Sequence, residues 1–165
     1  MKKLAAFLGG KHPLRISLVG ALVLTVILIV IDQIIAPGDI PGIVEYEVAG
    51  STARALEILG LWGEAGRTFF LRTVWLDYLY PLAYSALLAG ALAKARNTTA
   101  AWFWPLLACL TDGLENAGLI HSALVYPNLS ENVVTFTAVF AGIKFFSLII
   151  SVGLLMGHSW RGTPN

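Results

Sequence analysis

Four ionisable residues, Asp77, Asp112, Glu115 and Lys144, lie within segments that are otherwise strongly apolar. A charged side chain at the centre of a membrane-spanning helix costs roughly 2.5–3.5 kcal/mol on insertion scales, so such residues need partners and often mark functional sites. Carboxylic acids beside an amine are also the groups that proton exchange and general acid–base chemistry require. We therefore predict that these four residues are the candidate catalytic groups.

The polar residues of each apolar segment recur at helical spacing. At about 3.6 residues per turn, Asp112, Glu115 and Asn116 share one helix face, and Asp77 shares a face with the tyrosines that follow it. These faces would be costly against lipid, so we expect them to turn inward and meet. The residues expected to bind a ligand through hydrogen bonds are Tyr80, Tyr84, Asn116 and Asp32.

Three acids facing one lysine leave an excess of negative charge in a setting of low dielectric constant. We expect at least one of these acids to hold its proton near neutral pH. Such a proton could serve transport or catalysis. A structural network of buried ion pairs would use the same residues, so the pattern alone leaves that alternative open.

The composition indicates an integral membrane protein. Of 165 residues, 57% are hydrophobic and 13% charged, and the mean hydropathy is +0.75, far more apolar than a soluble domain. The formal net charge of +1 argues against a nucleic-acid partner. No metal or cofactor motif is present, so we expect neither. Cys109, the only cysteine, is expected to serve packing.

The apolar segments predict an all-α bundle of four transmembrane helices forming a single domain over residues 1–165. The expected spans cover about residues 14–36, 68–93, 101–120 and 132–156, and an extracytoplasmic segment covers residues 37–67. In this arrangement Asp77, Asp112, Glu115 and Lys144 all fall in the outer half or near the middle of the bundle.

The basic residues indicate the orientation. One side of the four-span arrangement carries most of them, namely Lys2, Lys3, Lys11, Arg15, Lys94, Arg96 and Arg161. The positive-inside rule places that side, with both termini, in the cytoplasm. We expect the protein to lie in a bacterial plasma membrane.

The segment between the first two spans carries several local signals. Residues 43–48 alternate apolar and acidic side chains, which predicts a short strand. Ser51 or Thr52 is placed to cap a following helix, and Trp62 is typical of the lipid headgroup zone. The segment is either a packed connection or a lid over the bundle.

Other enzyme classes fit less well. Ile31, Asp32 and Gln33, with the topology and length, superficially resemble lipoprotein signal peptidases, a resemblance that implies one catalytic aspartate on each of the last two spans. Asp112 could serve as the first, but the last span offers Lys144 and no aspartate. We therefore do not expect peptidase activity.

Our leading functional hypothesis is a small or lipid-like ligand bound at the charged cluster with proton exchange, and with acid–base chemistry as an extension. The first alternative is a proton- or cation-coupled transporter. The second is a structural or assembly subunit, with a second copy or another membrane protein as partner; the small-residue pairs on the helices suit such packing.

Overall fold

The computed structural model describes residues 2–96 and 100–159, and this part of the chain is helical, with no β-strand. Arg161, counted above among the inner charges, lies outside the described residues. The elements are α1 (Lys2–Leu8), α2 (Lys11–Ile35), α3 (Ile43–Glu47), α4 (Thr52–Thr73), α5 (Trp75–Arg96), η1 (Ala100–Trp102), α6 (Phe103–Val125) and α7 (Glu131–Ser159).

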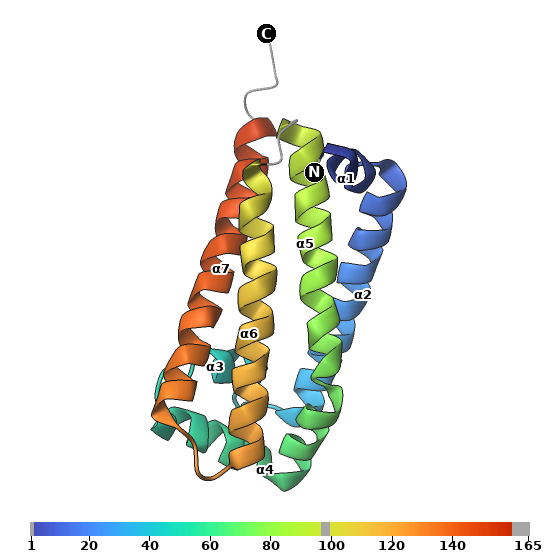
Figure 1. The fold of residues 1–165 in the computed structure, drawn as a ribbon. Coiled ribbons are helices and arrows are strands. Elements are labelled where there is room, and N and C mark those ends of the chain that lie inside the picture. The colour runs from blue at the N-terminus through green and yellow to red at the C-terminus, as the bar shows by residue number, and fades with distance from the viewer. Residues whose placement is uncertain (1, 97–99, 160–165) are drawn as a thin grey trace.

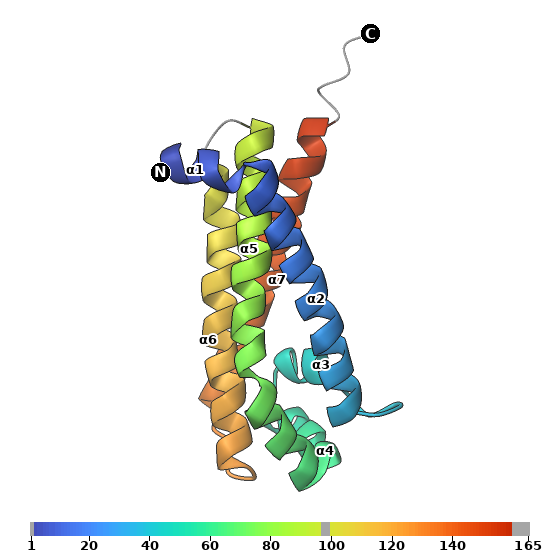
Figure 2. The same ribbon diagram turned by 90° about the vertical axis from the view of Figure 1, so that its right-hand side faces the viewer.

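Four long helices, α2, α5, α6 and α7, run side by side along the molecule (Figure 1). Helix α6 packs on α7 and α5, and α2 packs on α5 and α4. The short α3 and the bent α4 cover one end of the bundle, and α1 lies at the other end (Figures 1 and 2). The prediction of an all-helical fold is confirmed.

Three of the described helices are long and apolar enough to cross a membrane. They are Lys11–Ile35, Trp75–Ala95 and Glu131–Gly157, with mean hydropathies of 2.7, 1.2 and 2.2. Large apolar side chains remain exposed on their outer surfaces, such as Ile16 on α2 and Ile149 on α7, which are 73% and 71% exposed. Such an apolar outer surface is compatible with a membrane protein.

The predicted strand at residues 43–48 is wrong, because Ile43–Glu47 form the helix α3. Its first turn is held from both sides: Asp32 Oδ1 accepts the Ile43 N–H at 2.7 Å, and Glu45 Oε2 accepts the Gly42 N–H at 2.9 Å. These two acceptors satisfy amide groups that a helix start leaves free. They therefore stabilise a short helix over the strand that the alternating pattern predicts.

Helix α4 extends further than the expected connection. The predicted cap is confirmed, since Ser51 Oγ accepts the Arg54 N–H at 3.3 Å. The helix changes direction at Gly63, whose φ of 63° suits a residue without a side chain. Because α4 continues to Thr73 and the chain turns at Val74, helix α5 begins at Trp75 rather than at residue 68.

A compact apolar cluster, which we call the cap core, joins α3 and α4 to the bundle. Its central members are Tyr46, Ile58, Leu59, Trp62 and Phe70. The rings of Tyr46 and Trp62 meet edge to face at 5.2 Å. Trp62 is only 5% exposed and donates its indole N–H to Pro41 O at 2.7 Å. This N–H is therefore bonded within the protein, and the place of Trp62 in the lipid headgroup zone stays a prediction.

Helices α6 and α7 approach closely at Gly118. A Cβ atom added there would collide with the Thr137 side chain. The close approach brings the polar face of α6 directly against α7, and this is the contact that positions the site.

Candidate functional site

A cavity of about 310 Å³ lies between α2 and α7, with α5 and α6 behind it and α3 at one end. This volume is at the lower end of the roughly 300–1,000 Å³ typical of small-molecule sites. It is lined by Thr25, Leu28, Ile29, Asp32, Ile43, Val44, Glu47, Asp77, Tyr80, Tyr84, Asp112, Lys144, Phe145 and Leu148.

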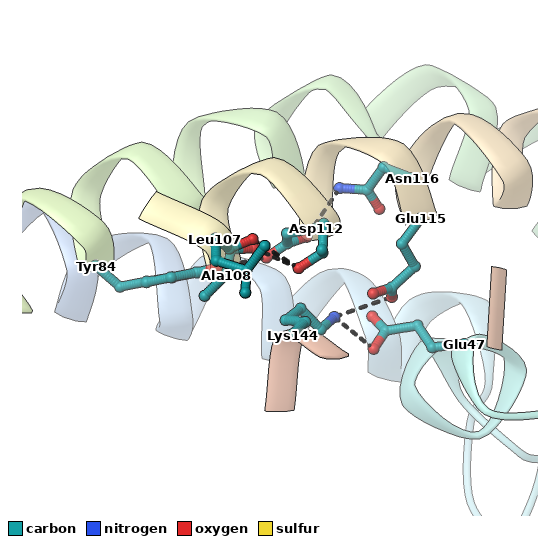
Figure 3. Close-up of polar contacts among 9 residues, drawn as sticks. Glu47, Tyr84, Leu107, Ala108, Asp112, Glu115, Asn116 and Lys144 are labelled. Atoms are coloured by element: carbon teal, nitrogen blue, oxygen red, sulfur yellow. Dashed lines mark hydrogen bonds and ion pairs between the residues drawn. The ribbon is translucent and has the colours of Figure 1, made fainter. Parts of the chain in front are cut away.

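Lys144 on α7 forms the charged centre of the cavity wall. Its Nζ donates to Glu115 Oε1 of α6 at 2.9 Å and to Glu47 Oε2 of α3 at 2.8 Å. All three side chains are buried, and the two carboxyl groups, from different helices, lie next to each other at the amine (Figure 3). We call Glu47, Glu115 and Lys144 the Lys144 triad.

Asp112 lies beside the triad and contacts neutral donors. The Tyr84 hydroxyl donates to Asp112 Oδ2 at 2.9 Å, and Asn116 Nδ2 donates to Oδ1 at 3.3 Å (Figure 3). Asp112 and Asn116 lie one turn apart on α6, as their spacing predicts. The Lys144 amine donates to the two glutamates of the triad rather than to Asp112.

Asp77 and Tyr80 complete the α5 wall. Asp77 lines the cavity. The Asn116 amide contacts the Asp77 carboxyl group. The Tyr80 hydroxyl accepts from Thr25 Oγ1 of α2 at 3.3 Å, and its ring meets that of Tyr84 edge to face at 5.3 Å. The shared face predicted for these α5 residues is therefore the one that faces the cavity.

Asp32 has a structural task as well as a place in the wall. It lines the cavity, but its Oδ1 is used by the Ile43 N–H at the start of α3. This hydrogen bond holds the short helix that carries Glu47, so Asp32 helps to place the triad. Ligand binding by Asp32 stays a prediction.

Glu47 is the site residue that the sequence did not reveal. The sequence places Glu47 in the extracytoplasmic segment, in a stretch whose alternation predicts a short strand or extended edge. In the helix, Ile43 and Glu47 lie one turn apart and face the cavity together, while Tyr46 turns into the cap core. The capping signals at Gly42 and Glu45 could have indicated the helix and hence the direction of Glu47.

Two buried acceptors next to the cavity wall have no hydrogen-bond donor. Glu115 Oε2 and Asn116 Oδ1 are fully buried and unpaired. The Glu47 carboxyl lies beside that of Glu115, close enough for a hydrogen bond if one of them carries a proton. An unsatisfied buried acceptor costs about 1–3 kcal/mol, so a proton shared by the two carboxyl groups would remove this cost at Glu115.

The cavity changes character from its wall to its mouth. Asp77 and Asp112 face it at the wall, whereas Ile29 and Val44 at the mouth are each 57% exposed. Such an arrangement can hold a molecule with a polar head and an apolar tail. It can also hold and pass a proton between neighbouring carboxyl groups.

Within the described residues, His, Cys, Asp and Glu side chains form no group of three or more that could hold a metal ion. Comparison of the chain with protein-family models, curated proteins and solved structures finds no match. The site's chemistry must therefore be inferred from its own residues.

Proposed function

We propose that the chain is an integral membrane protein that binds a small amphipathic ligand in the cavity between α2 and α7, with proton exchange at the Lys144 triad. The observation that carries this proposal is the cavity itself, with a charged wall at one end and exposed apolar residues at the other. A soluble ligand would gain little from that apolar mouth, whereas a molecule residing in a bilayer could enter from the side.

A fourth span, α6, belongs to this proposal. It has 23 residues, which gives about 35 Å of helix, comparable with the roughly 30 Å hydrocarbon core of a bilayer. Its acids turn inward, and its outward side chains are apolar, as shown by the exposure of Phe103, Leu106 and Leu110. The acids lower its hydropathy without facing lipid, which favours its place beside the three apolar helices.

The proposed orientation keeps both termini in the cytoplasm and α3 and α4 outside. Exposed Lys11, Arg15 and Lys94 lie at the end of the bundle opposite α4, which agrees with the positive-inside rule. The cavity then opens in the outer half of the membrane, next to α3.

Proton exchange is supported by the unpaired Glu115 Oε2. A proton shared by Glu47 and Glu115 would satisfy this atom and leave the triad neutral, with one negative carboxylate opposite the ammonium group. In an enzymatic form of the proposal, Asp77, Asp112 or Glu115 acts as acid or base, Lys144 stabilises developing charge, and Tyr80 and Tyr84 orient the ligand.

Photo-crosslinking tests the binding proposal. A dodecyl probe with a photoreactive diazirine on its chain is added to the protein in a non-ionic detergent, and the adducts are located by mass spectrometry. We expect adducts concentrated at Ile29, Phe145 and Leu148. An Ile29→Trp variant should remove them.

The matched control is Val30→Trp, because Val30 is also exposed on α2 but does not line the cavity. This variant should keep the adducts. Adducts distributed evenly over exposed residues such as Ile149 and Leu124 would show general contact with the apolar surface and contradict a binding site.

A further inference from the structure

We infer that the ligand is a protonated amine carrying a single apolar chain, an inference that rests on the proposed function and names its ligand class. The ammonium group would lie against Asp77 and Asp112, and the chain would leave the cavity between α2 and α7. Two features of the wall lead to this class: its negative charge, and its acceptors and aromatic rings.

The first feature is uncompensated negative charge. Lys144 is already committed to Glu47 and Glu115, and Asp32 accepts a backbone N–H. The contacts of Asp112 are a phenol and an amide, both neutral. Among the described residues, Asp77 and Asp112 form no ion pair. Lys144 is the cation that acts on both from nearby, and it is already paired with two glutamates. The acids at the cavity therefore outnumber the cations, and an anionic head would meet repulsion there.

The second feature is the set of acceptors and aromatic rings in the same wall. The Asp77 and Asp112 carboxyl groups line the cavity together with the rings of Tyr80 and Tyr84. A primary ammonium group brings three N–H donors, whereas a sulfate, a phosphate or a carboxylate brings acceptors only. Tyr80 and Tyr84 add ring faces that favour a cation.

The volume of the cavity and its apolar mouth indicate that the ligand carries a single apolar chain. A volume of about 310 Å³ holds about ten water-sized groups, enough for the head and the start of one chain. Beyond that point Ile29, Phe145 and Leu148 offer an apolar exit. A single chain fits this opening, and an inorganic cation would leave the apolar mouth unused.

The test is competition against the photoreactive dodecyl probe at the cavity mouth. Dodecylammonium should displace the probe at a concentration at least about tenfold lower than dodecyl sulfate or dodecanol does. Methylammonium, which has the head without the chain, should compete far more weakly. Equal competition by the three dodecyl compounds would overturn the inference about charge while leaving the amphiphile site intact.

Separate substitutions test the recognition of the ligand's charged head group and of its apolar chain. Asp77→Asn combined with Asp112→Asn should bring the tenfold preference close to one, whereas Glu131→Gln, an exposed acid at the start of α7, should leave it unchanged. Ile29→Trp leaves every acid in place and should remove labelling by the probe, which tests the apolar exit separately from the charged wall.

Three results would overturn the inference. These are an unchanged preference in the double variant, methylammonium competing as strongly as dodecylammonium, and the absence of any adduct at the mouth. The last result would also overturn the proposed function, whereas the first two would not.

Discussion

Two adjacent residues of α3 face two different environments. Tyr46 enters the cap core, where its hydroxyl donates to Leu119 O at 3.2 Å and also contacts Ser122. Glu47 enters the Lys144 triad, beside acceptors that have no donor. The cap core is apolar and satisfied, whereas the cavity wall carries excess charge and unsatisfied atoms. The first region stabilises the fold, and the second is the region to which we assign ligand binding.

The largest loss in the cap core should follow Trp62→Ala. This change opens a cavity among Tyr46 and Phe70 and removes the hydrogen bond to Pro41, so we expect the free energy of unfolding to fall by about 3–5 kcal/mol. Denaturant unfolding in detergent measures the loss. Trp75→Ala is the control, because Trp75 is 58% exposed; equal losses from both variants would contradict a packed cap core.

A comparable loss at the cavity should follow Lys144→Met, but for an electrostatic reason. The variant leaves two buried carboxyl groups without their cation, at a cost of about 3–5 kcal/mol. Adding Glu47→Gln and Glu115→Gln should restore much of the stability, since the buried charge is then gone. A triple variant less stable than Lys144→Met alone would show that charge balance does not govern this region.

A smaller effect is expected from Asp32→Asn, which weakens the charge-assisted hydrogen bond to the Ile43 N–H. Bonds of this kind contribute about 1.5–3 kcal/mol. Local loosening of α3 should appear as faster amide hydrogen exchange at residues 43–47. Asp39→Asn serves as the control because Asp39 is exposed, and equal exchange in the two variants would contradict the anchoring role of Asp32.

The smallest effect should follow Tyr46→Phe, at about 1 kcal/mol near neutral pH. Burial raises the pKa of the Tyr46 phenol, so the folded protein keeps this proton when the unfolded chain releases it above pH about 10. The stability of the native protein should therefore fall more steeply above that pH than that of the variant. Parallel pH profiles would contradict a buried phenol.

Helical periodicity correctly predicted the fold class and the inward faces. The spacing of Asp112, Glu115 and Asn116 within one apolar segment was enough to predict a buried polar face, because such residues are costly in lipid. The same reasoning brought Asp77 and Lys144 toward that face. These inferences use one helix at a time, and the sequence supports them well.

Contacts that depend on tertiary structure could not be predicted in this way. Glu47 lies in the predicted extracytoplasmic segment, where alternation over a few residues resembles a strand. The capping of α3 instead makes this stretch a helix and directs Glu47 to the cavity. The pairing of Lys144 with Glu47 joins residues far apart in the chain. Likewise, the hydrogen bond from the Trp62 indole to Pro41 O could not be predicted from the sequence.

The most direct test of the account is the infrared spectrum of the protein in lipid vesicles near neutral pH. We expect a carbonyl stretching band from a protonated carboxylic acid, which Glu115→Gln or Glu47→Gln removes and dodecylammonium shifts. Absence of this band from the native protein, or a band that neither the substitutions nor the amine alters, would contradict an exchangeable proton at the ligand cavity.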